Sequence, residues 1–127
     1  MFNLNGTISS TSQALSIENR GFRYGDSLFE TIRVHQGHIL FWEDHYFRLM
    51  ASMRILRMEI PMHFTMEFLE EQILNTIKAN DLLDKTARVR LYVYRREGGL
   101  YQPKDRNVDY LILADQLDSD SYMFTAT

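Results

Sequence analysis

Alternating hydrophobic and polar positions predict the long strands of this chain. In residues 28–35 every second side chain falls on the same face of an extended backbone. One face carries Leu28, Glu30, Ile32 and Val34, and the other carries Phe29, Thr31, Arg33 and His35. The same period returns in residues 87–94, where Val89, Leu91 and Val93 share one face and Arg88, Arg90, Tyr92 and Tyr94 share the other. A last long strand is expected at residues 108–114.

Glycine-containing dipeptides predict tight hairpin turns. Asn5-Gly6 separates the short segments 2–4 and 7–9, and both of its residues tolerate a positive φ. Gln36-Gly37 follows the first long strand and is expected to turn the chain into an antiparallel strand at residues 38–42. The chain is therefore expected to open with a small hairpin and to continue with a larger one.

Amphipathic helices are predicted between the two groups of strands, because hydrophobic side chains recur there every three to four residues. The first helix begins near Glu43 and Asp44, which favour a helix N-terminus, and continues to about Arg57. The second covers residues 64–80, with Thr65 as its N-terminal cap. Both helices are expected to pack on a common core.

The order of these elements predicts an α+β fold. Strands, two consecutive helices and further strands are typical of an antiparallel sheet with both helices on one face. We expect residues 1–115 to form this domain. The polar run from Asp115 to Ser121 resembles a linker, so residues 116–127 are interpreted as an interdomain linker and the start of a missing C-terminal domain.

Composition narrows the class of protein. A chain of 127 residues with 45% hydrophobic side chains can bury one core but not two ordinary ones. Its net charge of −3, with both signs mixed along the chain, argues against nucleic acid or an anionic membrane as partner. No apolar run is long enough to span a bilayer, and the N-terminus lacks a targeting pattern, so we expect a soluble cytoplasmic protein. The absence of cysteine excludes disulfides and thiolate catalysis.

Arginines supply the clearest candidates for a binding site. A glycine-punctuated turn before the first long strand and Arg48 on the helix after it suit an anionic cofactor. Arg48 lies on a polar stripe with His45 and Ser52, and its planar donors suit a phosphate, although periodicity alone favours an arginine that covers the core and keeps its head in water. Arg90 shares a strand face with tyrosines and could bind a small carboxylate; a plain solvent-facing strand is an equally good interpretation.

Several other kinds of site are disfavoured by the sequence. No metal-ligand spacing occurs among His35, His38, His45 and His63. The phosphate-loop and nucleophile-elbow motifs are missing as well. The available lysines sit at helix ends, connections or loops where nothing would desolvate the amine, and they are Lys78, Lys85 and Lys104.

As an ordered set, four segments of the chain resemble the class IV, fold type IV pyridoxal phosphate enzymes. The segments are residues 1–6 (MFNLNG), 20–30 (RGFRYGDSLFE), 44–49 (DHYFRL) and 88–91 (RVRL). This family includes branched-chain aminotransferases, D-amino acid aminotransferases and aminodeoxychorismate lyases. By that resemblance the chain looks like the smaller N-terminal domain, which agrees with the fold expected from the pattern.

The resemblance also implies roles for single residues. Arg48 falls where the family places the arginine that binds the phosphate of pyridoxal 5′-phosphate. Tyr24, Phe29 and Arg90 fall at positions that line the substrate pocket in branched-chain members, partly across a dimer interface. The loop residues Gly98, Gly99 and Tyr101 look like a substrate-side loop. The lysine that binds the cofactor covalently lies beyond this chain in the family, so the polypeptide alone is expected to be inactive.

The function implied by the resemblance is amino transfer between a branched-chain-like amino acid and a 2-oxo acid, carried out by a homodimer. One alternative within the family is aminodeoxychorismate lyase, which releases 4-aminobenzoate and pyruvate. Phe29 favours the branched-chain aminotransferase, whereas the opening segment (residues 1–6) and the glycine pair favour the lyase. An alternative of another class is a non-catalytic binding or dimerisation module. Nucleic acid, membrane and metal are not expected among the partners.

Overall fold

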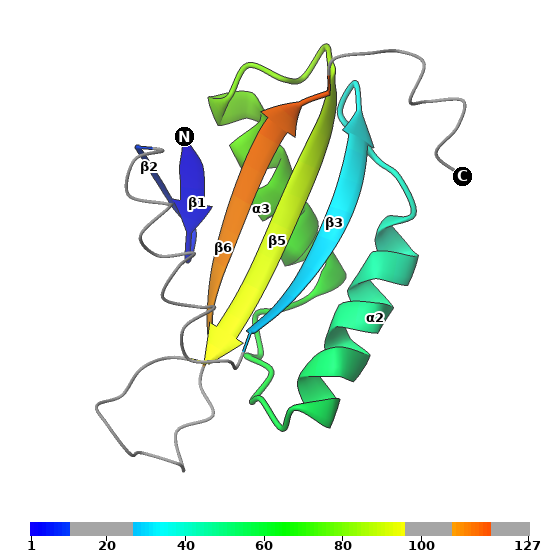
Figure 1. Ribbon diagram of the computed structural model, residues 1–127, viewed down its shortest axis with the longest axis vertical. Helices are drawn as coiled ribbons and strands as arrows, with labels where there is room; N and C mark the ends of the chain where they lie inside the picture. The colour runs from blue at the N-terminus through cyan, green and yellow to red at the C-terminus, as the bar shows by residue number, and fades with distance from the viewer. Residues whose placement is uncertain (11–26, 96–107, 118–127) are drawn as a thin grey trace.

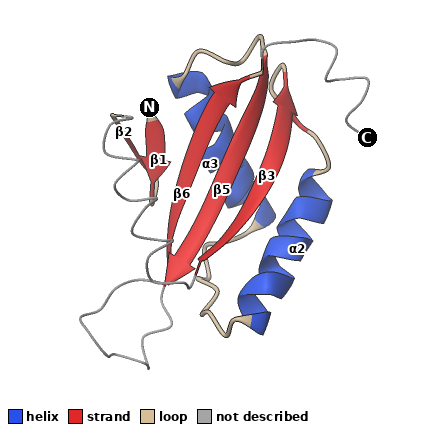
Figure 2. Ribbon diagram, in the orientation of Figure 1, coloured by secondary structure: helices blue, strands red, loops and turns tan. Residues whose placement is uncertain are grey.

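The computed structural model describes residues 1–10, 27–95 and 108–117 of the chain. In these residues six strands form one antiparallel sheet in the order β2-β1-β6-β5-β3-β4 (Figure 1). The strands are β1 (Phe2–Leu4), β2 (Thr7–Ser9), β3 (Ser27–His35), β4 (His38–Ile39), β5 (Thr86–Arg95) and β6 (Val108–Gln116). The helices α2 (Trp42–Ile55) and α3 (Met66–Ala79) follow one another between β4 and β5 (Figure 2). The predicted α+β fold is confirmed.

Both predicted turns have the expected backbone. Asn5 and Gly6 adopt φ angles of 52° and 92°, and the backbone N–H of Gly6 donates to Asn3 Oδ1 at 2.7 Å. Gln36 and Gly37 adopt φ angles of 48° and 82°. These left-handed conformations match the twist of a two-residue hairpin, so the sheet register is fixed at these points by the turns.

The prediction of a strand at residues 38–42 is wrong beyond Ile39. Phe41 takes a left-handed conformation with φ 56°, and Trp42 already begins α2. The indole Nε1 of Trp42 donates to the carbonyl of Met66 at 3.2 Å, which ties this residue to the start of α3. Tertiary packing of the tryptophan therefore overrides the extended pattern that the sequence suggested.

The helix ends follow local chemistry. Thr65 Oγ1 accepts a hydrogen bond of 3.0 Å from the backbone N–H of Phe68, as the predicted cap requires. At the other helix, α2 ends two residues before the predicted Arg57, which itself adopts a φ of 55°. A left-handed residue cannot continue an α-helix, so the chain turns there toward α3.

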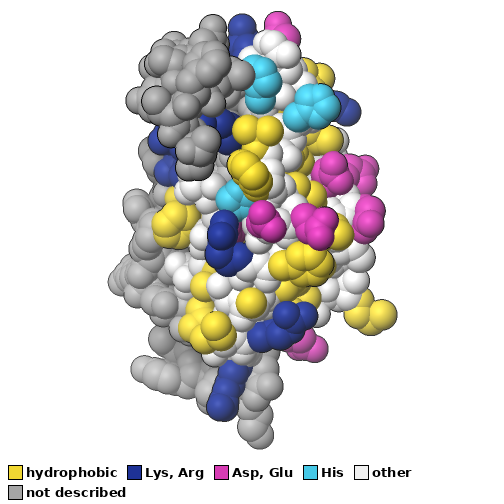
Figure 3. Space-filling view, turned by 90° about the vertical axis from the view of Figure 1, so that its right-hand side faces the viewer, with side chains coloured by type: hydrophobic (Ala, Val, Ile, Leu, Met, Phe, Trp, Pro, Cys, Tyr) yellow, Lys and Arg dark blue, Asp and Glu magenta, His cyan; other side chains and the backbone are white. Residues whose placement is uncertain are grey.

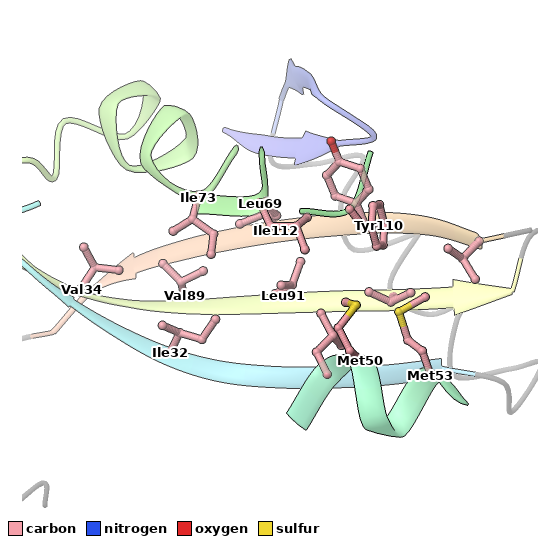
Figure 4. Packing of buried hydrophobic residues seen from close by; sticks show 14 of the residues in the cluster. Ile32, Val34, Met50, Met53, Leu69, Ile73, Val89, Leu91, Tyr110 and Ile112 are labelled. Atoms are coloured by element: carbon pink, nitrogen blue, oxygen red, sulfur yellow. The ribbon is translucent and has the colours of Figure 1, made fainter. Parts of the chain in front are cut away.

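The main core lies between the sheet and the two helices. Figure 4 shows side chains from one face of β3, β5 and β6 meeting side chains of both α2 and α3. Ile32, Val89 and Leu91 are fully buried and meet Met53 and Ile73 of the helices in this cluster. Each fully buried side chain of this size contributes about 1.5–3 kcal/mol relative to an exposed one. The inward face of the alternating pattern is therefore the face that the helices cover.

The last strand is longer than predicted. Asp115 and Gln116 belong to β6, where they lie opposite Arg88 and Ala87 of β5. The linker interpretation is thus wrong for these two residues, because their pairing to β5 continues the sheet. Residues 118–127 lie outside the described part of the chain. No described helix has the length and apolar character that a membrane span requires.

Candidate functional site

A carboxylate stands on the inward face of β3, where the alternating pattern otherwise places hydrophobic side chains. Glu30 lies between Leu28 and Ile32 on that face, and its side chain is only 11% exposed. Arg48 of α2 donates from Nε to both carboxylate oxygens at 3.1 Å and from Nη2 to Oε1 at 2.9 Å. The strand and the helix are therefore connected by a bidentate ion pair at this point.

A histidine completes this cluster. His45 lies one helical turn before Arg48, and its Nδ1 is 2.6 Å from Oε1 of Glu30. The same nitrogen is 3.1 Å from Arg48 Nη2. A single Nδ1 cannot donate to the carboxylate and accept from the guanidinium at once, and the shorter contact assigns its proton to the bond with Glu30. Glu30, His45 and Arg48 are called the Glu30 cluster below.

The charges of the cluster shift its ionisation. Burial acts to raise the pKa of Glu30, but hydrogen bonds from Arg48 and His45, together with the charges of both, outweigh it and leave the pKa below its ordinary value. The hydrogen bonds and charge of Glu30 raise the pKa of Arg48. Both groups are therefore ionised at neutral pH.

The guanidinium of Arg48 keeps one edge open. Glu30 occupies the edge formed by Nε and Nη2, whereas the Arg48 side chain as a whole is 59% exposed. The donors on Nη1 and the second hydrogen of Nη2 point away from the occupied edge, because the group is planar. Arg48 is thus neither a freely projecting head nor a residue enclosed in a cleft: it is fixed on one side and accessible on the other. Figure 3 shows acidic, basic and histidine side chains gathered near exposed hydrophobic ones on this side of the molecule.

Arg90 and Phe29 lie on the opposite, outward face of the sheet. Phe29 faces Tyr92 of β5 across the register, and their ring centroids are 5.7 Å apart. Arg90 Nη1 donates to the Tyr92 hydroxyl at 3.4 Å, and its Nη2 is 3.5 Å from Asp115 Oδ2. Phe29 is 54% exposed and the Arg90 side chain 32%. This arrangement combines an accessible apolar ring with hydrogen-bond donors.

The two groups of candidates lie on opposite faces of the sheet near one of its edges. Within the described residues β4 pairs only with Val34 and His35, so the first part of β3 has a neighbouring strand on one side, β5. Glu30 and Phe29 are consecutive in β3 and point to its two faces. The structure therefore brings Arg48 and Phe29 to one strand edge but places Arg90 one strand further in. Tyr24, Gly98, Gly99 and Tyr101 lie outside the described residues.

Of the Glu30 cluster, the sequence interpretation selected only Arg48 as a site residue, and it selected neither His45 nor Glu30. An acidic residue on an otherwise apolar strand face requires a partner when it is buried. That requirement, together with an arginine on the next helix, was the available signal. The strand pattern alone could not reveal which helical residue would reach it.

Other features of the described residues do not add to this site. A cavity of about 360 Å³ is lined by Asn5, Pro61, His63, Phe64, Phe68, Val108 and Tyr110, none of them in the Glu30 cluster. No described group of three acidic or histidine side chains could hold a metal ion. Lys78 and Lys85 are exposed, as the prediction that they are not desolvated requires, and Lys104 lies outside the described residues.

Comparisons with known proteins identify the family of the chain. The family model of amino-transferase class IV matches residues 27–126. A protein of Methanocaldococcus jannaschii, provisionally named a branched-chain-amino-acid aminotransferase, is 36% identical over 98 residues, which are 76% of this chain and 33% of that protein. The aminodeoxychorismate lyase of Bacillus subtilis is 33% identical over 96 residues, 73% of this chain and 31% of the lyase.

Solved structures extend the comparison to three dimensions. The branched-chain amino acid aminotransferase of Escherichia coli superposes with a TM-score of 0.74 at 23% identity, covering 94% of this chain and 40% of that one. Another branched-chain amino acid aminotransferase, solved with pyridoxamine 5′-phosphate, gives a TM-score of 0.74 at 25% identity and covers 93% of this chain and 40% of its own. The chain spans about a third of the length of the curated relatives it matches. The extent of the family match and the shared fold show that the chain belongs to the class IV aminotransferase family.

Proposed function

We propose that this chain is the N-terminal part of a longer, pyridoxal phosphate-dependent aminotransferase, in which Arg48 binds the phosphate of the cofactor. The observation that carries the proposal is the state of Arg48: fixed on one edge by Glu30 and accessible on the other. A phosphate can accept two parallel hydrogen bonds from such an edge. The charged guanidinium and the exposed donors therefore fit the phosphate group.

When bound, pyridoxal phosphate supplies the electron sink for amino-group exchange. The described part of this chain is proposed to contribute positioning rather than the covalent step, because its lysines, Lys78 and Lys85, have exposed side chains that water solvates, whereas an activated amine is usually desolvated. We place the lysine that reacts with the cofactor in the remaining part of the longer protein.

The outward face of the sheet is proposed as part of the substrate side. Arg90, with Tyr92 beside it, offers cationic and hydroxyl donors for a carboxylate, and Phe29 offers an apolar surface for a hydrocarbon side chain. This combination suits the exchange of an amino group between a branched-chain-like amino acid and a 2-oxo acid. In the proposed homodimer, Tyr24, Gly98, Gly99 and Tyr101 complete the pocket.

The reaction is tested in the longer protein with pyridoxal phosphate added. Leucine and 2-oxoglutarate should give glutamate, and a coupled assay measures the glutamate formed. The identity of 33% to the Bacillus subtilis lyase makes elimination from aminodeoxychorismate the second candidate, read from the formation of 4-aminobenzoate. Activity with aminodeoxychorismate and none with leucine would replace the first proposal by the second. No binding of pyridoxal phosphate at all would favour a non-catalytic module.

A further inference from the structure

We propose that Glu30 and His45 are positioning residues that hold the guanidinium of Arg48 in the orientation needed to receive the cofactor phosphate. This inference rests on the proposed role of Arg48. Besides joining a strand to a helix, Glu30 and His45 determine which edge of the Arg48 guanidinium is available to an anion.

The donors of Arg48 divide between two edges of its guanidinium group. An arginine side chain carries five N–H groups in a rigid plane. The Glu30 carboxylate takes those on Nε and one on Nη2, at distances of 2.9–3.1 Å. Of the three remaining N–H groups, one on Nη1 and one on Nη2 share the edge between these two atoms. A second bidentate acceptor can bind there without displacing the first.

The carboxylate of Glu30 is itself held in place by burial. Glu30 projects from the middle of β3 toward α2, and its side chain is 11% exposed. Exposed ion pairs are weak because both long side chains must be ordered and water competes for them. Here one partner is already fixed by burial, so the cost of ordering falls mainly on Arg48. The pair can therefore hold a preferred guanidinium orientation before any ligand binds.

His45 contacts the same carboxylate as Arg48. Its Nδ1 lies 2.6 Å from Oε1 of Glu30, the same oxygen that accepts from Arg48 Nη2. A donor on each side of this oxygen restricts rotation of the carboxylate about its last bond. His45 is itself only 13% exposed. The histidine thus acts on Arg48 through Glu30 and needs no contact with the cofactor.

If Glu30 and Arg48 only balanced each other's charge, removal of the Glu30 charge would change phosphate affinity in the opposite direction. If Glu30 only neutralised Arg48, removal of its negative charge would leave a more positive site and would strengthen phosphate binding. If Glu30 positions Arg48, the same change releases the guanidinium and weakens phosphate binding. Substitution Glu30→Gln removes the charge and keeps nearly the same shape, so it separates the two cases.

The experiment measures binding of pyridoxal 5′-phosphate and of pyridoxal, which lacks the phosphate, to the longer protein by equilibrium dialysis. Glu30→Gln should weaken pyridoxal phosphate binding about tenfold, the size of one lost hydrogen bond to a charged group, and should leave pyridoxal binding unchanged. Glu43→Gln removes an exposed carboxylate from the first turn of the same helix and should change neither. Unchanged or tighter pyridoxal phosphate binding by Glu30→Gln would overturn the inference.

Variants of His45 provide a second, independent readout if Glu30→Gln does not fold. His45→Ala should weaken pyridoxal phosphate binding, and His45→Asn should largely restore it because its amide N–H can replace Nδ1–H. A circular dichroism spectrum of each variant checks the fold. Equal binding by the wild type and His45→Ala would contradict the role of the histidine.

Arg48→Ala separates failure of this inference from failure of the proposed function. If Arg48→Ala leaves pyridoxal phosphate binding unchanged, Arg48 is not the phosphate ligand and both ideas fail. If Arg48→Ala weakens binding but Glu30→Gln and His45→Ala do not, only the positioning role is lost. The double variant Glu30→Gln/Arg48→Ala should bind no more weakly than Arg48→Ala alone, because Glu30 acts through Arg48.

Discussion

Arg48 can serve two acceptors at once because its donors lie on two edges of one planar group. One edge is used inside the protein by Glu30, and the other is exposed. A lysine could not replace it, because an ammonium group is a point charge without a fixed fork of donors. The proposed binding of phosphate by Arg48 therefore depends on the guanidinium geometry as well as on its charge.

Removal of the Arg48 side chain should weaken cofactor binding. In the longer protein, Arg48→Ala is expected to reduce the binding free energy of pyridoxal phosphate by about 1.5–3 kcal/mol, the range for hydrogen bonds to a charged group. A fluorescence titration measures the loss. Arg54→Ala serves as the matched control, since Arg54 is an exposed arginine on the last turn of the same helix. Equal affinities for the two variants would count against the assignment.

Arg90 should affect the substrate more than the cofactor. It lies on the outward face of the sheet beside Tyr92, whereas the Glu30 cluster faces α2. Arg90→Ala is therefore expected to raise KM for the amino acid while leaving the affinity for pyridoxal phosphate nearly unchanged. Steady-state kinetics and a cofactor titration of the same preparation give both values. Equal damage to both would argue that Arg90 has no separate carboxylate role.

At the scale of helices and strands, the sequence pattern predicts features that depend on neighbouring residues. It misses features that depend on residues far away in the sequence. The two faces of β3 and β5 and the cap of α3 follow from spacing of two or three residues, and the structure confirms them. The strand expected through Trp42 fails because its indole contacts Met66, 24 positions away. Glu30 was missed as a site residue for a related reason: its partner lies on another element.

The cap of α3 gives a prediction for stability. Thr65→Ala removes the side-chain acceptor of the Phe68 N–H and should lower the free energy of unfolding by about 1 kcal/mol. Thr65→Ser keeps an acceptor and should retain most of the stability. Urea unfolding of both variants beside the wild type measures the difference. A Thr65→Ala protein as stable as Thr65→Ser would show that the bond contributes nothing.

Across the molecule, burial of one hydroxyl should make stability sensitive to alkaline pH. Tyr110 is 3% exposed, and its hydroxyl, which points toward the β1–β2 hairpin in Figure 4, has no hydrogen-bond partner among the described residues. Burial raises the pKa of Tyr110 to about 12. In the unfolded chain a tyrosine ionises near pH ~10, so the unfolded state loses its proton first as the pH rises.

The sign of the effect follows from the proton count. Between these two pKa values the folded state binds more protons than the unfolded state, so the free energy of unfolding falls with rising pH, by up to about 1.4 kcal/mol per pH unit for this group. Tyr110→Phe should be at least as stable as the wild type at pH ~8 and should lose less stability toward pH ~11. Urea unfolding at both values compares the two proteins. Parallel losses would rule out a contribution from Tyr110.

The sheet, its two helices and the edge of β3 together present one charged and one apolar group of side chains. In the proposed site the cofactor phosphate contacts the charged group. The most direct test is a crystal structure of the longer protein with pyridoxal phosphate. We predict phosphate oxygens within hydrogen-bonding distance of Nη1 and Nη2 of Arg48, while Nε stays bonded to Glu30. A phosphate held elsewhere, with Arg48 contacting only Glu30 and water, would contradict the account.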